Sequence, residues 1–103
     1  MPDLSQQLLP ALQHNTIQGL DLDPGLIYPA YAGQSVLNIP SSICHWLGAP
    51  GLGAPSLIPD ILETVAGEFR RVILVLMDAL ALHRLQRWMA DGTAPVWRDL
   101  SQQ

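Results

Sequence analysis

An unbroken apolar run constrains the fold of this chain more than any other feature. Residues 72–77 read Val-Ile-Leu-Val-Leu-Met, with Arg70 and Arg71 before the run and Asp78 directly after it. Alternating apolar and polar residues would indicate a strand with one solvated face, whereas an unbroken run is typical of a strand covered on both faces in a parallel sheet. The sequence therefore predicts an α/β fold in which residues 72–77 form a buried parallel strand.

The residues after Asp78 change to a helical period. One face is apolar, the opposite face is polar, and Gly92 is placed to end the helix; the apolar stripe consists of Ala81, Leu82, Leu85, Trp88 and Met89. A strand followed by a helix begins an α/β unit, but a strand needs neighbours for its backbone N–H and C=O groups. Because the 103 residues hold no second run of this kind, we expect the N-terminal portion of a larger αβα sandwich. Pairing with a second chain is the alternative.

The chain divides by composition near residue 55. Residues 1–55 are rich in Pro and Gly and predict an irregular helical lead-in. One helix is expected over 3–13, kinked or split at Pro10, and Asn38 caps and Gly48 ends another. Residues 56–103 predict the incomplete start of a catalytic α/β domain, opening with a helix that Ser56 caps and Gly67 ends.

Composition excludes several classes of function. Hydrophobic residues make up 49% of the chain and charged residues 14%, against a typical charged share of about 25%, so a disordered tail is excluded. The five basic residues are all Arg and the net charge is −4, which leaves no basic stripe for nucleic acid. Cys44 is the only cysteine, so the chain can form neither an internal disulfide nor a multi-cysteine zinc cage.

The start lacks the pattern of a signal peptide and the longest apolar run is too short for a bilayer, so we expect a cytoplasmic protein with no membrane partner.

Asp78 is the residue with the sharpest chemical interpretation. It lies at the carboxyl end of the predicted strand, where ligands of open α/β sheets collect, and its carboxylate suits a metal ion. Asp is also a preferred helix N-cap, so the pattern leaves both roles open. A dehalogenase-type phosphotransferase would need a second Asp where Leu80 stands, and a receiver domain would need a Lys, which the chain lacks.

Two segments resemble a known family. Residues 72–80, Val-Ile-Leu-Val-Leu-Met-Asp-Ala-Leu, are similar to the first strand of the alkaline phosphatase superfamily, in particular of its type I phosphodiesterase/nucleotide pyrophosphatase branch. Upstream, a Gly-x-Ser…Asn-apolar-Pro segment resembles the lead-in of bacterial members; its residues here are Gly33, Ser35, Asn38 and Pro40. The resemblance covers about residues 28–100, and Ala79 stands where the family commonly has Gly.

The resemblance implies a metal-dependent phosphoric-ester hydrolase that acts on a small phosphate ester. Asp78 would be a ligand of one of two catalytic metal ions, often zinc. The family's nucleophile is a Thr or Ser farther along, and neither Thr93 nor Ser101 has the expected setting, so no catalytic residue is assigned within this chain and the fragment itself is expected to be inactive.

The alternative hypothesis is a small non-enzymatic helical interaction module that associates through its apolar faces. In either case we expect the isolated chain to self-associate. The remaining candidates receive structural interpretations. His14 and His45 are expected to be loop or surface-helix residues and His83 to be solvated, and Cys44 is expected to be a small buried hydrophobe.

Overall fold

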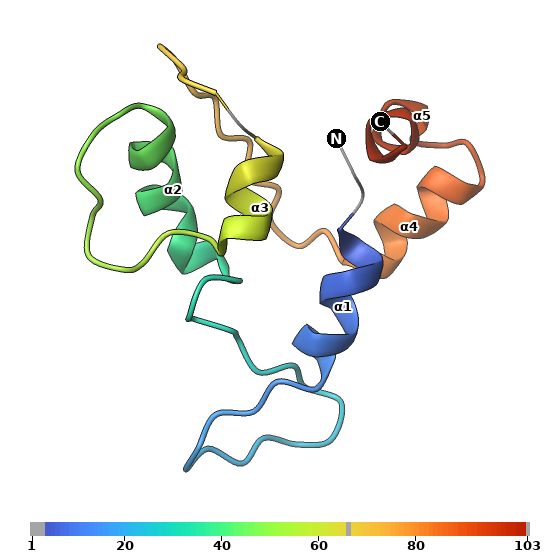
Figure 1. Ribbon diagram of the computed structural model, residues 1–103. Coiled ribbons are helices and arrows are strands. Elements are labelled where there is room, and N and C mark those ends of the chain that lie inside the picture. Colours follow the sequence, from blue (N-terminus) through green and yellow to red (C-terminus); the bar gives the residue numbers. More distant parts are fainter. Residues whose placement is uncertain (1–3, 66, 103) are drawn as a thin grey trace. The chain divides into compact units, whose positions relative to one another are not determined.

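The computed structural model describes residues 4–65 and 67–102, and the chain falls into two units. The unit Leu4–Val72 holds three α-helices and one 3-10 helix: α1 (Ser5–Gln13), η1 (Val36–Asn38), α2 (Ile39–Trp46) and α3 (Pro59–Thr64). The unit that begins at Ile73 holds α4 (Leu82–Ala90) and α5 (Pro95–Ser101) (Figure 1).

The predicted α/β fold is wrong for this structure, because none of the described residues forms a strand. Val72–Met77 has no regular secondary structure. Val72 is half-buried, and the side chains from Ile73 to Met77 are exposed, Ile73 at 88% and Val75 at 72%. The physical reason is that a strand is stable only where other strands satisfy its backbone groups, and the part of the chain that the structure describes supplies none. The buried parallel strand and the αβα sandwich are therefore not seen.

Two helices of the lead-in agree with the sequence pattern. α1 runs from Ser5 to Gln13 with Pro10 inside it, so the helix does not split there. α2 has Pro40 in its first turn, where the absent N–H has no partner to lose, and Gly48 follows it with a φ of +69°. The predicted boundary after residue 55 stays a prediction.

The bounds of α3 and α4 differ from the pattern. α3 begins at Pro59 with Ile58 in the N-cap position, so the prediction that Ser56 caps it is wrong. α3 ends at Thr64, ahead of the predicted stop at Gly67, and residue 66 lies outside the described residues. α4 starts later than predicted, at Leu82.

The end of the second unit holds a helix that the pattern did not predict. α5 begins at Pro95, and its approach is fixed by a hydrogen bond from Ala94 N to Trp88 O at 2.9 Å. At the end of α4, Thr93 donates its backbone N–H to Asp91 at 2.9 Å. A hydrogen bond from the Thr93 hydroxyl, and after it this backbone hydrogen bond, hold the pKa of the Asp91 carboxyl below its ordinary value.

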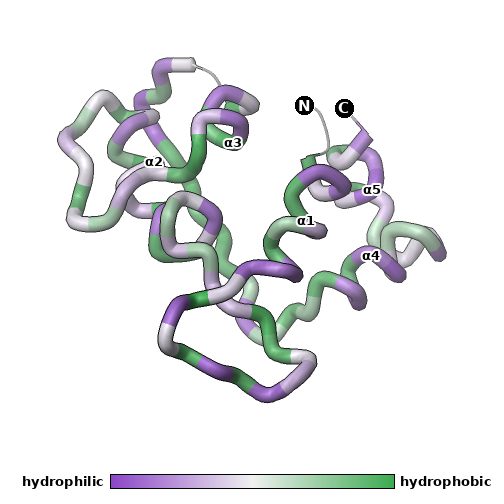
Figure 2. The backbone as a smooth tube through the Cα atoms, turned by 60° about the horizontal axis from the view of Figure 1, so that its bottom comes forward, coloured by the Kyte–Doolittle hydropathy of each residue, from purple (hydrophilic) through white to green (hydrophobic). Residues whose placement is uncertain are grey.

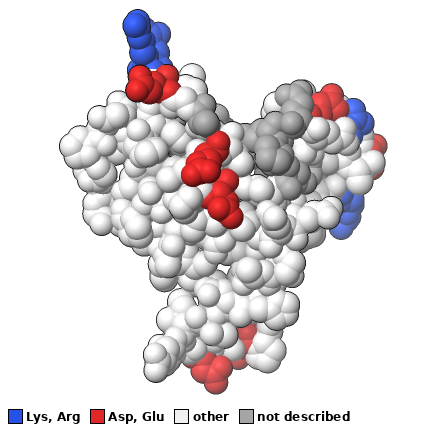
Figure 3. Space-filling view, in the orientation of Figure 1, with Lys and Arg blue, Asp and Glu red and all other residues white. Residues whose placement is uncertain are grey.

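The buried side chains of the first unit are polar. Asn38 and Ser42 are completely buried and Ser41 is 5% exposed, whereas no hydrophobic side chain of residues 4–65 and 67–102 is buried. Hydrophobic residues lie along the irregular segments as well as along the helices (Figure 2). Charged side chains occupy only a few places on the face shown in Figure 3. The lead-in is therefore held by a hydrogen-bonded core rather than by an apolar one.

Candidate functional site

Asn38 is the centre of the polar core. Its Oδ1 accepts hydrogen bonds from the backbone N–H and the hydroxyl of Ser35, both at 3.0 Å. Its Nδ2 donates to Tyr31 O at 2.9 Å and to Pro55 O at 3.0 Å. One buried amide therefore joins the segment before η1 to the loop that follows α2. Asn38 does occupy the N-cap position of α2, but its side chain does not cap the helix as predicted.

Two serines of α2 continue this network toward the same loop. Ser42 donates to Asn38 O at 2.8 Å and accepts the backbone N–H of Leu57 at 2.8 Å. Ser41 accepts the N–H of Leu52 at 3.1 Å and lies 2.6 Å from Ala54 O, its nearest acceptor. The Gly/Pro loop is thus anchored on α2 through side-chain oxygens.

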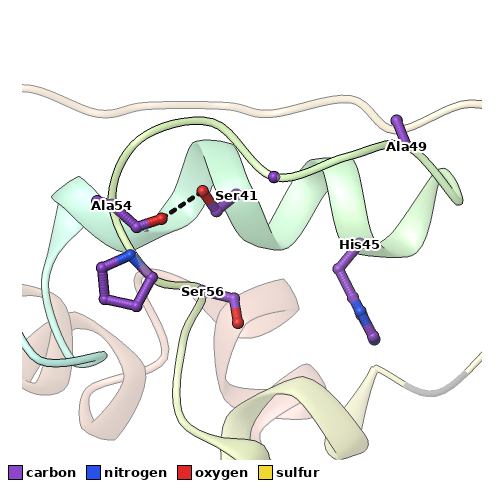
Figure 4. Close-up of a pocket in the computed structure, with 7 residues that line it drawn as sticks. Ser41, His45, Ala49, Ala54 and Ser56 are labelled. Carbon is purple, nitrogen blue, oxygen red and sulfur yellow. Dashed lines mark hydrogen bonds between the residues drawn. The ribbon is translucent and has the colours of Figure 1, made fainter.

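A pocket of about 290 Å³ lies between α2 and this loop (Figure 4). Ser41 and His45 line it from one helix face, four residues apart, and Ser56 lines it from the loop. The hydroxyl of Ser41 is held by backbone groups of the loop, so it is a structural group rather than a free nucleophile. His45 is exposed, as predicted.

Asp78 lies in the second unit, in a turn that precedes α4. Its side chain is exposed, and Oδ1 accepts the backbone N–H of the next residue, Ala79, at 2.8 Å. The N-cap of α4 is Ala81, and no side chain caps that helix. Of the two roles that the pattern left open, the helix cap is therefore not the role of Asp78 in this structure.

Ala79 has the backbone conformation that glycine favours. Its φ is +56°, and it is the only residue other than glycine with a positive φ among the described residues. The left-handed conformation costs an L-residue roughly 1–2 kcal/mol, because Cβ approaches the carbonyl oxygen. A Gly at this position, which the sequence resemblance gives as the family's usual residue, would adopt the turn without that cost.

We expect Ala79→Gly to stabilise the turn. Relief of the left-handed strain outweighs the extra backbone entropy of glycine, so the gain is about 0.5 kcal/mol or slightly more. The gain is measured as slower hydrogen exchange of the backbone amide of residue 79, which donates to Asp78. Ala79→Val is the matched opposite change and should speed this exchange, since a β-branched residue fits a positive φ less well. Faster exchange in the glycine variant would contradict the strained turn.

The other candidates form no metal site. His14 places Nδ1 2.7 Å from Pro10 O, and His83 is exposed on α4. Cys44 is a free thiol and is only half-buried, so the prediction of a buried residue is not met. Within residues 4–65 and 67–102, no three or more His, Cys, Asp or Glu side chains gather closely enough to hold a metal ion.

The comparisons with known proteins add no relative. No protein-family model, no curated protein and no solved structure matches this chain. Among the helices that the structure describes, none is long and apolar enough to cross a membrane.

The sequence interpretation missed the buried serines. Ser41 and Ser42 were read only as part of the lead-in, because Ser is usually exposed. A signal was nevertheless available: two adjacent serines on a short helix, next to an Asn and followed by a loop rich in Gly and Pro, offer several side-chain hydrogen bonds to loop backbone.

Proposed function

We propose that this chain is the N-terminal part of a metal-dependent phosphoric-ester hydrolase, and that Asp78 is one of its metal ligands. The observation that carries the proposal is the Asp78 turn: the carboxylate is exposed, it does not cap α4, and its following residue has a glycine-like backbone. A carboxylate held by a local N–H bond and open to solvent is available to bind a cation.

The lead-in gives independent support. The residues that carry the upstream resemblance are also those that organise the first unit: Gly33 and Asn38 are buried, and Ser35 bonds to Asn38 through its backbone and its hydroxyl. The Gly-x-Ser…Asn pattern is thus tied to a defined three-dimensional arrangement in this chain.

The described residues do not make a metal centre by themselves. Asp78 offers a single carboxylate, and no cluster of three or more ligating side chains occurs in the described part of the chain. In our proposal the remaining ligands of the two zinc ions, and the nucleophile, come from residues other than those described, and the 103-residue chain alone does not hydrolyse the ester.

The test replaces Asp78 by asparagine in the complete polypeptide that carries this sequence. Asn retains the shape of the side chain and can still accept the Ala79 N–H, but it loses the negative charge that a cation requires. Bound metal and turnover of an aryl phosphodiester should fall together by at least about tenfold. Asp91→Asn is the matched control, because Asp91 is an exposed carboxylate that also accepts a local backbone N–H. Unchanged metal content and turnover in Asp78→Asn would overturn the assignment.

One observation favours the second candidate function, a non-enzymatic interaction module. Exposed apolar side chains continue from Ile73 to Met77, each between 44% and 88% exposed. A contiguous apolar surface of this kind is typical of a protein interaction site. If the complete polypeptide binds no metal and hydrolyses no ester, this function takes precedence.

A further inference from the structure

The exposed apolar segment has charges of opposite sign at its two ends. Arg70 and Arg71 precede Val72–Met77 and Asp78 follows it, and these three charged side chains are exposed. No backbone hydrogen bond joins Val72–Met77 to any other described residue. A β-prone apolar segment with unpaired N–H and C=O groups is a template for pairing with another strand.

We propose that this segment pairs with the same segment of a second copy of the chain, as an antiparallel β-ribbon. The order of the charges along the segment favours a second copy as the partner and an antiparallel direction of pairing. Parallel pairing in register would place Arg70 against Arg70 and Asp78 against Asp78, which is repulsive at both ends. Antiparallel pairing brings the basic end of each copy to the acidic end of the other.

Symmetry and charge together fix the register. In a two-fold antiparallel ribbon the axis is perpendicular to the sheet, so one residue lies opposite its own counterpart and the side chains keep their face. If that residue is Leu74, Arg70 lies opposite Asp78 at both ends of the ribbon. If it is Val75, Asp78 lies opposite Val72 and both ion pairs are lost. The charges therefore favour the register centred on Leu74.

The apolar side chains fit this arrangement. Directly opposite pairs are Val72 with Leu76 and Ile73 with Val75, and three of these four residues are β-branched, as strand positions favour. Even-numbered residues lie on one face and odd-numbered residues on the other. Both faces of the ribbon are apolar, so we expect dimers first and larger assemblies at higher concentration.

This inference goes beyond the proposed hydrolase function and does not depend on it. Asp78 cannot bind a metal ion while it is paired with Arg70, so the two states exclude each other. The pairing is measured on the metal-free 103-residue chain, and the hydrolase on the complete polypeptide, so either proposal can fail without the other.

A charge exchange tests the direction and the register. Sedimentation velocity over a wide concentration range should show self-association of the wild-type chain. Asp78→Arg should raise the dimer dissociation constant at least about tenfold, because repulsion replaces attraction at both ends. Arg70→Asp combined with Asp78→Arg should restore it to within about threefold of wild type. Asp21→Arg, which makes the same change of net charge at an exposed residue in the first unit, should leave it unchanged.

Cysteine cross-linking tests the centre of the ribbon in a Cys44→Ala background. Opposed Cα atoms in an antiparallel pair are close enough for a disulfide, whereas the next symmetric position is too distant. Leu74→Cys should therefore oxidise to a covalent dimer at least about fivefold faster than Val75→Cys. A wild-type chain that stays monomeric overturns the second copy as partner. Faster cross-linking of Val75→Cys, or a double charge variant that does not recover, overturns the register.

Discussion

Replacing Asn38 by alanine is expected to destabilise the first unit by about 3–4 kcal/mol, since it removes a buried group with several partners at once. The variant loses two hydrogen bonds at Oδ1 and two at Nδ2, and it leaves Tyr31 O, Pro55 O and Ser35 N without their partner. The cost exceeds that of one ordinary hydrogen bond because each partly buried group that loses its partner carries its own desolvation penalty. Hydrogen exchange of the Leu57 amide, which donates to Ser42, measures the opening of this network.

Asn15→Ala is the matched control for this prediction. Asn15 also donates through Nδ2 to two backbone carbonyls, Tyr28 O at 3.2 Å and Pro29 O at 3.1 Å, but its side chain is only half-buried. Water can replace the lost partner there, so the cost should stay below about 1 kcal/mol. Equal effects of the two substitutions would contradict the polar core, because they would show that burial of Asn38 contributes nothing.

Asn38→Asp adds a pH signature that packing loss cannot imitate. The introduced carboxyl keeps an acceptor for Ser35, but it turns an oxygen toward the carbonyls of Tyr31 and Pro55 where the amide had donated. Burial and these oxygens raise the pKa of the introduced group in the folded state above its unfolded value of about 3.9. A raised folded pKa means that stability is present at low pH and is lost as the pH rises. The variant should therefore approach wild type below about pH 4 and fall away from it toward neutrality.

Periodicity predicted most helices of this chain, because a helix satisfies its own backbone. α1, α2 and α4 follow apolar residues at helical spacing, and their hydrogen bonds need no distant segment. The strand prediction for Val72–Met77 was wrong for the same reason. Its apolar residues are typical of a strand, but a strand forms only beside other strands, which the described residues lack. α5 was missed because it is a short helix whose main signal is Pro95 at its start.

The sequence predicted Asp78 as the candidate site residue but could not decide between its two possible roles. Asp78 stands out because it follows the apolar run. The structure shows that Asp78 does not cap α4, which starts at Leu82, and its role as a metal ligand stays a prediction. The left-handed conformation of Ala79 was not predictable from an alanine, whose preference is for negative φ. Asn38 was predicted at the start of α2, but the hydrogen-bond partners of its buried side chain lie up to 17 residues away in the chain. Long-range partners of this kind leave no local pattern.

Gly33→Ala is expected to disrupt the contact between the lead-in and the segment before α3. Gly33 is buried with a φ of +119°, and it accepts the backbone N–H of Ile58 at 2.9 Å. A Cβ atom there would lie 2.8 Å from Ile58 Cγ2 and 3.1 Å from Ile58 N. The first contact can be relieved by the side chain, whereas the second involves backbone that the hydrogen bond holds. Backbone strain and overpacking together should cost about 2–4 kcal/mol.

Two further variants separate these causes, with hydrogen exchange of the Ile58 amide as the measurement. Gly25→Ala changes a glycine with a φ of +99° whose added Cβ would meet nothing within 4 Å, so it should show backbone strain alone, about 1–2 kcal/mol in its own turn, and leave Ile58 exchange unchanged. Ile58→Ala removes Cγ2 but leaves the contact with the Ile58 backbone. The double variant Gly33→Ala/Ile58→Ala should therefore be destabilised by somewhat less than the sum of the two single substitutions. Full recovery would show that the side-chain contact alone excludes a larger residue. Full additivity would show that Gly33 and Ile58 are not coupled, and the close approach that joins these two segments would then be wrong.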